Sequence, residues 1–161
     1  MTSKKVILAG SFGVGKTSLF NQFIYSKFDD KYLTTIGVKV NKKVIQIGDR
    51  ELSILLWDIA GEVSQNKVPV TYFLGVSGVI YVFDLSRPTT FKNIEDDMNY
   101  LKEIIDGGVI RMVGNKKDLL TEEQLEEVKE QISIPFDIAT SAKTGENVEQ
   151  LFHDLGQALL D

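Results

Sequence analysis

The sequence predicts an α/β fold in which a six-stranded, mostly parallel sheet carries helices on both faces. Apolar strand-like runs alternate with amphipathic helical stretches along all 161 residues, and this alternation is typical of a parallel sheet. Only Gly48 and Asp49 separate the second strand from the third, so this pair must form an antiparallel hairpin at one edge. The predicted strands are Lys4–Ala9, Lys39–Ile47, Arg50–Asp58, Gly78–Asp84, Val109–Asn115 and Phe136–Ala139.

Helices are predicted where apolar residues recur every three or four positions. A capping box from Thr121 to Gln124 opens the third helix, and Asn147 is the expected N-cap of the last. We assign the apolar stripes to the core and give them no chemistry. The stripes are Leu19–Ile24; Ile94, Met98, Leu101 and Ile105; Leu125, Val128 and Ile132; and Val148, Leu151, Phe152, Leu155 and Leu159.

The composition indicates one soluble domain over residues 1–161, which we expect to be a cytoplasmic monomer. Hydrophobic residues make up 43% of the chain and charged residues 25%. A net charge of −5 argues against binding nucleic acid or an anionic membrane. The absence of cysteine excludes disulfides, zinc–thiolate sites and thiol catalysis. The longest apolar window, Val68–Phe83, is interrupted by polar residues, proline and glycines, so we expect no spanning helix.

The strongest functional motif lies between the first strand and the first helix. Gly10–Thr17 reads G-S-F-G-V-G-K-T and fits the pattern G-x-x-x-x-G-K-[ST]. Its glycines allow backbone N–H groups to surround phosphate oxygens, and the helix N-terminus adds its dipole. Lys16 can reach the β- and γ-phosphates, and the Thr17 hydroxyl can bind Mg²⁺. The motif therefore predicts a nucleotide phosphate site.

A second motif, Asn115-Lys116-Lys117-Asp118, follows the fifth strand. The Asp118 carboxylate can accept hydrogen bonds from N1–H and the exocyclic amine of guanine, whereas adenine offers it a lone pair. Ser141-Ala142-Lys143 lies on the next loop, where the Ala142 N–H could reach the guanine 6-oxygen. These loops predict recognition of guanine.

Two weaker motifs point to the metal and the γ-phosphate. Asp58, at the end of the third strand, can hold Mg²⁺ through water, and the Gly61 N–H can reach a γ-phosphate. A hydroxyl of the Thr34-Thr35 pair could complete the coordination of Mg²⁺.

Ligands in such sheets bind beyond the carboxyl ends of the strands. The loops at those ends are 10–17, 58–62, 85–88, 115–118 and 140–143, and polar motifs fall in four of the five. We expect these loops to converge on one site. Loop 85–88 carries no motif.

The order G-x-x-x-x-G-K-T, T-I-G, W-D-x-A-G, N-K-x-D, S-A-K resembles the Ras superfamily of small GTPases over essentially the whole chain. The local sequence at Lys27-Phe28, Tyr32–Val38 and Leu56–Gly61 is most similar to that of the Rab branch. The resemblance implies a three-layer P-loop NTPase fold and a Mg²⁺-dependent switch that hydrolyses GTP to GDP and phosphate. It also implies effectors, an exchange factor and an activator, with switch segments near 29–38 and 61–73.

The resemblance also implies a role for individual residues. Lys16, Thr35, Gly61 and Glu62 would act in hydrolysis, and Thr17, Thr35 and, through water, Asp58 would hold Mg²⁺. Phe28 would pack edge-on against guanine. The nucleotide would be bound by Gly13, Val14, Gly15, Lys16, Thr17, Ser18, Phe28, Asn115, Lys116, Asp118, Ser141, Ala142 and Lys143.

The chain departs from the family pattern at three places. Glu62 stands where a glutamine normally orients the attacking water, so we expect retained but slow hydrolysis. Phe12 replaces a small residue in the phosphate loop, and its ring either crowds an activator's arginine or simply faces solvent. No cysteine follows the last helix, so either a lipidated tail has been removed or the protein has no lipid anchor.

Two alternatives remain from the sequence alone. One is a GTP-binding interaction module with negligible hydrolysis, in which Glu62 and Phe12 are the disabling changes. The other is an ATP-dependent P-loop enzyme, against which Asp118 argues. His153, the only histidine, is expected near the surface of the last helix and has no assigned role.

Overall fold

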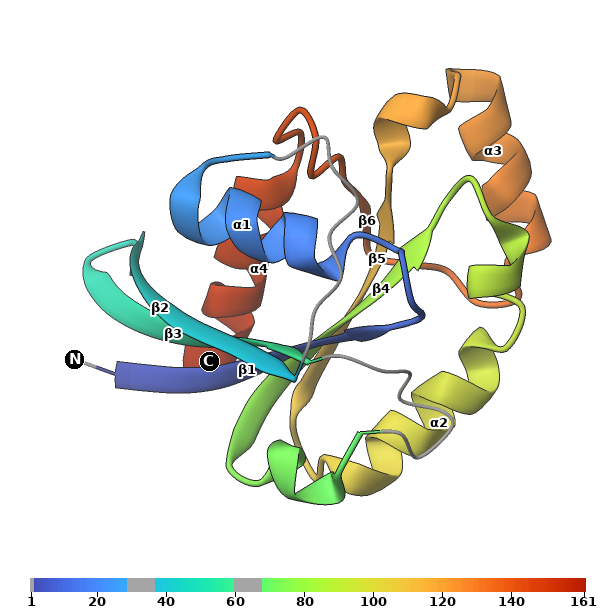
Figure 1. The fold of residues 1–161 in the computed structure, drawn as a ribbon. Helices are drawn as coiled ribbons and strands as arrows, with labels where there is room; N and C mark the ends of the chain where they lie inside the picture. Colours follow the sequence, from blue (N-terminus) through green and yellow to red (C-terminus); the bar gives the residue numbers. More distant parts are fainter. Residues whose placement is uncertain (1, 29–36, 60–67) are drawn as a thin grey trace.

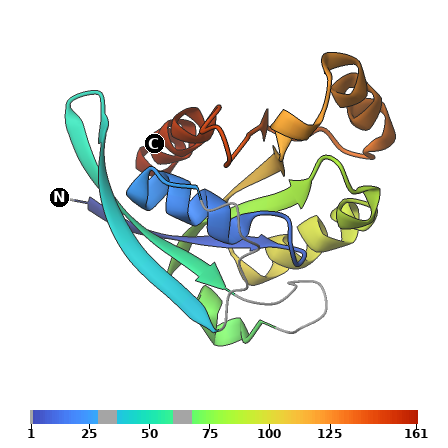
Figure 2. The ribbon, with the colours of Figure 1, turned by 45° about the horizontal axis from the view of Figure 1, so that its top comes forward.

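A computed structural model describes residues 2–28, 37–59 and 68–161, and its sheet has the predicted six strands (Figure 1). The strand order is β2-β3-β1-β4-β5-β6, with β2 antiparallel to β3 and the other pairs parallel. The β2–β3 hairpin forms the outer edge of the sheet beside the N-terminus (Figure 2). The strands are β1 (Thr2–Gly10), β2 (Val38–Ile47), β3 (Arg50–Ile59), β4 (Val76–Asp84), β5 (Val109–Asn115) and β6 (Ile138–Ala139).

The sixth strand is shorter than predicted, because only Ile138 and Ala139 pair with β5. Immediately before it, the Asp137 carboxylate accepts the backbone N–H of Met112 at 2.7 Å, so a side chain replaces a strand carbonyl there. Phe136, predicted within the strand, instead packs edge-on against Phe83 with ring centroids 5.3 Å apart.

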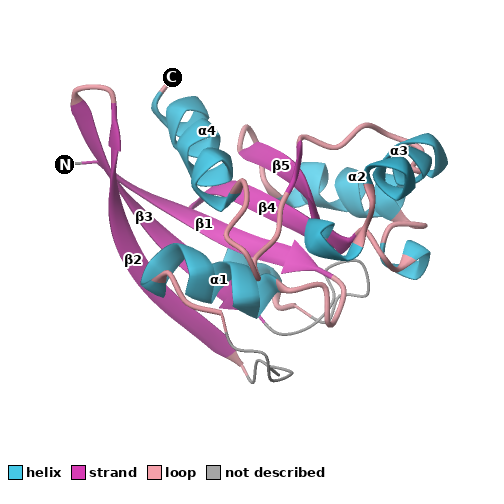
Figure 3. Ribbon diagram, turned by 90° about the horizontal axis from the view of Figure 1, so that it is seen from above, coloured by secondary structure: helices cyan, strands magenta, loops and turns pink. Residues whose placement is uncertain are grey.

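Helices cover both faces of the sheet and complete three layers. The helices α1 (Lys16–Tyr25) and α4 (Val148–Leu160) pack on one face, and α2 (Ile94–Ile104) and α3 (Glu122–Gln131) pack on the other. In Figure 3, α1 and α4 lie in front of the strands. The predicted apolar stripes of α2, α3 and α4 are buried, as expected. His153 is exposed on α4.

Both faces of the central strands are apolar because each face is covered. In β1, Val6 and Leu8 join the core beneath α1 and α4, whereas Ile7 and Ala9 join the core beneath α2 and α3. Complete burial of such a side chain contributes roughly 1.5–3 kcal/mol. The alternation therefore fixes the register of the strand that leads into the phosphate loop.

The two predicted helix caps have different outcomes. The Thr121 hydroxyl accepts the Gln124 N–H, and the Gln124 side chain accepts the Thr121 N–H, so the capping box is confirmed. Asn147 stands at the N-cap position of α4, but its side chain makes no capping bond. Its backbone is left-handed, with φ 64°, and its amide donates to Ala139 O at 2.9 Å. The side chain thus ties α4 to β6.

A close approach brings α4 onto the hairpin. A Cβ on Gly156 would lie 3.1–3.2 Å from side-chain atoms of Ile45, Ile47 and Leu52, so any larger residue there requires these side chains to shift by a few tenths of an ångström. Among the residues that the structure describes, none of the helices combines the length and the apolar character needed to cross a bilayer.

Candidate nucleotide-binding site

Three glycines shape the loop between β1 and α1. Gly10, Gly13 and Gly15 have φ values of 140°, 76° and 102°, which side chains rarely adopt. A Cβ on Gly10 would lie 2.1 Å from Val82 O, and one on Gly15 would lie 2.2 Å from Asn115 Nδ2. The motif therefore needs glycine at both positions, for conformation and for space.

Lys16 and Thr17 begin α1 with their side chains held near the loop. Lys16 is buried, and its Nζ donates to Gly10 O at 2.8 Å. The Thr17 hydroxyl donates to Asp58 Oδ2 at 2.6 Å, which brings the end of β3 to the start of α1. The Asp58 carboxylate is fully buried. A hydroxyl and a carboxylate side by side are the oxygen ligands that Mg²⁺ prefers, so these residues fit that ion.

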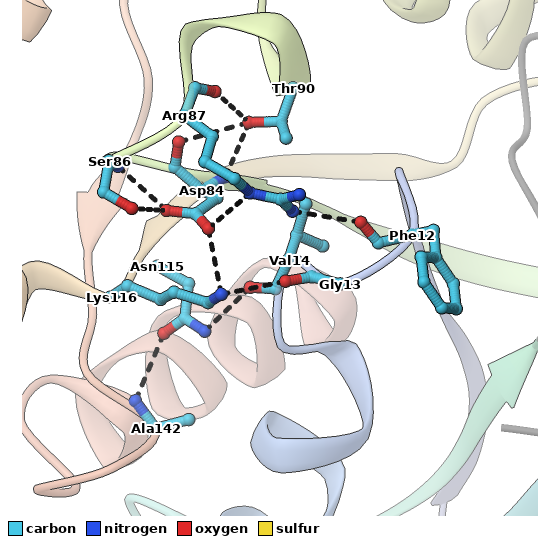
Figure 4. Close-up of polar contacts among 10 residues, drawn as sticks. All are labelled: Phe12, Gly13, Val14, Asp84, Ser86, Arg87, Thr90, Asn115, Lys116 and Ala142. Carbon is cyan, nitrogen blue, oxygen red and sulfur yellow. Dashed lines mark hydrogen bonds and ion pairs between the residues drawn. The ribbon is translucent and has the colours of Figure 1, made fainter. Parts of the chain in front are cut away.

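The Asn115 side chain joins three loops. Its Nδ2 donates to Val14 O at 3.0 Å, and its Oδ1 accepts the Ala142 N–H at 3.1 Å and the Thr140 hydroxyl at 3.0 Å. Figure 4 shows the amide between the loop of Val14 and the loop of Ala142. The side chain is 1% exposed, so its donor and acceptor groups are both satisfied inside the protein.

Neighbouring residues add further links between these loops. Lys116, with a left-handed backbone at φ 69°, donates from Nζ to Gly13 O at 2.9 Å. Asp118 Oδ1 accepts the Ser141 hydroxyl at 2.8 Å, and Lys117 forms an ion pair with Glu146. The expected convergence of loops 10–17, 115–118 and 140–143 is therefore present.

The loop of residues 85–88, whose sequence carries no recognised motif, also contacts these loops. Asp84, at the end of β4, is 1% exposed and forms ion pairs with Arg87 and Lys116, both at 2.9 Å. Burial raises the pKa of the Asp84 carboxyl, but hydrogen bonds from Ser86, Lys116 and Arg87 outweigh it and hold the pKa below its usual value. A carboxylate at a strand end, followed by Arg87, was the available signal.

A further link comes from α1. Gln22 donates from Nε2 to Ala142 O at 2.8 Å and so fixes the loop of Ser141 and Ala142 from the helix side. Sequence reasoning placed Gln22 only within an amphipathic stretch. A polar residue on the helix that follows the phosphate loop gave no specific sign of this contact.

The remaining predicted site residues occupy varied positions. Val14 is buried, Ser18 is partly buried, and Lys143 and Asp118 are exposed. Phe28 is 37% exposed, which leaves part of its ring open to a ligand. Thr35, Gly61 and Glu62 lie outside the described residues, as do most of the two predicted switch segments.

Residues 68–73 form the described end of the second switch segment. Val68 and Phe73 are buried in the core beneath α2, whereas Val70 is exposed and Tyr72 is half-buried against Trp57. The sequence left open which of these residues are core. Phe12, in the phosphate loop, is 57% exposed.

Comparison with known proteins gives a consistent result. The model of the Ras family matches residues 5–161. Ras-related protein SEC4 of Saccharomyces cerevisiae is 33% identical over 160 residues, which cover 96% of this chain and 74% of that protein. Ras-related protein Rab-13 of Rattus norvegicus is 33% identical over 162 residues, covering 97% of this chain and 79% of that protein.

Proposed function

Because the chain belongs to the Ras family of small GTPases, which bind GTP and GDP, we propose that it is a Mg²⁺-dependent switch that hydrolyses GTP slowly. The whole of residues 1–161 forms one GTPase domain in this proposal. The bound ligand is a guanine nucleotide, whose phosphates lie in the loop of residues 10–17. Its base lies against the loops of residues 115–118 and 140–143.

The Asn115 amide is the observation that carries this proposal. It contacts the phosphate loop with its donor and the Ala142 loop with its acceptor, within 3.1 Å in each case. A phosphate-binding loop and a base-recognition motif could belong to separate sites in a chain of this length. Here one buried side chain joins them, which supports a single nucleotide site.

Guanine recognition is assigned to Asp118, supported by Ala142. Asp118 Oδ1 accepts the Ser141 hydroxyl, which fixes the carboxylate in position. The carboxylate then pairs with two donors of guanine. In this proposal the Ala142 N–H, which donates to Asn115 Oδ1 in this structure, also bonds the 6-oxygen when guanine is bound. Phe28, Lys116 and Lys143 complete the base site.

Lys16, Gly13, Val14, Gly15, Thr17 and Ser18 bind the phosphates in this proposal. Lys16 Nζ, held near the loop by Gly10 O, supplies a positive charge to the β- and γ-phosphates. Thr17, Thr35 and, through water, Asp58 would hold Mg²⁺. When bound, this ion neutralises charge on the phosphates of the nucleotide.

Enzymes of this family accelerate hydrolysis by positioning the reacting groups and by electrostatic stabilisation, and not by forming a covalent intermediate. Lys16 stabilises the charge that develops on the transferred phosphoryl group, and Gly61 offers a backbone N–H to the γ-phosphate. Glu62 accepts a proton from the attacking water but cannot donate to a phosphate oxygen, and its charge repels the phosphate. We therefore expect slow intrinsic turnover.

Partners of the proposed switch are effectors that bind residues 29–38 and 61–73, together with an exchange factor and an activator. The described end of the second segment supports this assignment. Val70 is exposed there while its neighbours Val68 and Phe73 anchor the chain in the core. An apolar side chain presented on an anchored backbone suits recognition by another protein.

Three measurements test the proposal. The nucleotide released on denaturing the purified protein should be GDP or GTP, and bound fluorescent GDP should be displaced by GTP far more readily than by ATP. Equal displacement by ATP would favour the ATP-dependent alternative and overturn the guanine assignment. Addition of a chelator of divalent cations should speed GDP release if Mg²⁺ is part of the site.

A further inference from the structure

The side chains around Asp84 form a cluster that holds the phosphate loop from outside (Figure 4). Asp84 Oδ1 accepts from the Ser86 N–H at 2.8 Å and from the Ser86 hydroxyl at 2.6 Å. Asp84 Oδ2 pairs with Arg87 Nε and with Lys116 Nζ. One buried carboxylate therefore positions two cations, and the cluster carries one net positive charge.

Both cations reach the phosphate loop. Arg87 Nη2 donates to Phe12 O at 3.0 Å, and Lys116 Nζ donates to Gly13 O at 2.9 Å. Arg87 lies so close to the loop that a Cβ on Gly13 would be 3.3 Å from Nη2. The contacts fall on consecutive carbonyl groups of the segment that surrounds the phosphates.

These contacts set the direction of the neighbouring N–H groups. In a planar trans peptide, the C=O of one residue and the N–H of the next point in opposite directions. A carbonyl held from outside the loop therefore turns the following N–H toward the inside. Arg87 in this way orients the N–H of Gly13, Lys116 orients that of Val14, and Asn115, through Val14 O, orients that of Gly15.

The Arg87 main chain is itself fixed. The Thr90 hydroxyl donates to Arg87 O at 2.7 Å. The same hydroxyl accepts a hydrogen bond from the Asp84 N–H at 2.9 Å. The guanidinium then uses one arm for Asp84 and another for Phe12 O, a two-point contact for which its planar fork is suited. A lysine ammonium keeps the charge but not this fork.

We propose that Arg87 is a positioning residue that holds the phosphate loop in its binding conformation and thereby slows release of the nucleotide. This rests on the proposed function, since it assumes that the loop binds a guanine nucleotide. Without Arg87, Phe12 O loses the hydrogen bond from Nη2, so the binding-competent fraction of the loop falls and the apparent affinity falls with it. The net positive charge of the cluster adds to the attraction for phosphate.

The test compares release of fluorescent GDP from wild-type protein and from the variants Arg87→Ala, Arg87→Lys and Arg50→Ala. We expect Arg87→Ala to release GDP about fivefold faster or more, since the loop loses a charge-assisted hydrogen bond. Arg87→Lys should lie between wild type and Arg87→Ala. Arg50 is exposed at the β2–β3 turn, and its replacement should leave the rate within about twofold.

Affinity for GMP separates positioning of the loop from a general loss of stability. GMP lacks the β-phosphate that the loop surrounds, so Arg87→Ala should weaken GDP binding more than GMP binding. Equal release rates in wild type and Arg87→Ala, or equal weakening of GDP and GMP, would overturn the inference while leaving the proposed function intact. A wild-type protein that binds no guanine nucleotide would overturn both.

Discussion

Asn115 Nδ2 donates to Val14 O across 3.0 Å, although the two residues are 101 positions apart in the chain. Asn115→Ala removes this bond and the bonds that Oδ1 accepts from Thr140 and Ala142. Because buried groups lose their partners, we expect the free energy of unfolding to fall by about 2–4 kcal/mol. GDP release should also accelerate by about 10²-fold, since both loops lose their connection.

Urea unfolding monitored by circular dichroism measures the first effect and fluorescent GDP release the second. Asn41→Ala is a suitable control, because the Asn41 amide also bonds another element, donating to the Tyr25 hydroxyl of α1 in a solvent-exposed contact. An Asn115→Ala protein that retained GDP as long as wild type would contradict the central role of this amide.

Asp118→Asn should change the preferred base. Xanthine has a carbonyl in place of the guanine exocyclic amine, and an asparagine amide can donate to that carbonyl. We expect affinity for GDP to fall by roughly 10- to 100-fold, equivalent to about 1–3 kcal/mol, and affinity for xanthosine diphosphate to rise. Equilibrium titration with both nucleotides measures this. Asp106→Asn, on an exposed residue, should leave both affinities unchanged.

Glu62→Gln should speed hydrolysis. The amide restores a donor to the γ-phosphate and removes a negative charge beside it, so we expect a single-turnover rate at least about tenfold higher. Phosphate release from protein preloaded with GTP measures the rate without a contribution from nucleotide exchange. An unchanged rate would remove any catalytic role for Glu62.

Phe12→Gly should make the protein more responsive to an activator. The Phe12 side chain is 57% exposed in the phosphate loop, where an activator's arginine would enter. With the catalytic domain of an activator of a Rab protein as probe, we expect greater acceleration of GTP hydrolysis in Phe12→Gly than in wild type. Equal acceleration of the two proteins would show that the ring does not obstruct the arginine.

Acid should weaken the Asp84 cluster. The folded-state pKa of Asp84 lies below its unfolded value, so the carboxylate stabilises the fold above about pH 3.9 and loses this effect as pH falls through the lowered pKa. The difference in unfolding free energy between wild type and Asp84→Asn should therefore be largest near pH 6 and shrink toward pH 3. Urea unfolding across this range measures it, and a difference independent of pH would contradict an ionised Asp84.

The sequence predicted the strands and helices well because periodicity reports burial, and burial here has two simple patterns. Strands covered on both faces, such as β4, read as continuous apolar runs. Helices covered on one side, such as α4, have apolar residues at every third or fourth position of the sequence. The prediction was wrong at Phe136, where the Asp137 side chain takes a ladder position, because local hydrophobicity does not report such a replacement.

The site was predictable wherever a motif carries its own chemistry, as at Lys16 and Asp118. The contact of Arg87 with the phosphate loop was not predictable from its one signal, a carboxylate at a strand end followed by an arginine, because it depends on which loop lies opposite and on the turn that Thr90 stabilises. Asn147 shows the same limit. Its residue type suits a helix cap, but the fold uses its amide to reach Ala139. Contacts that a single side chain makes with another element leave no periodic pattern in the sequence.

The contacts between Val14 and Asn115, Gly13 and Lys116, and Phe12 and Arg87 all lie on the part of the sheet formed by β1, β4 and β5. The residues proposed to bind near the third phosphate, Thr35 and Gly61, precede and follow the β2–β3 hairpin in the sequence. In the proposed switch, we therefore expect these three contacts to persist when the terminal phosphate is cleaved. For the proposed switch, we therefore expect the lifetime of the GDP-bound form to depend on how often the loops of residues 10–17 and 115–118 separate, and not on the rate of hydrolysis.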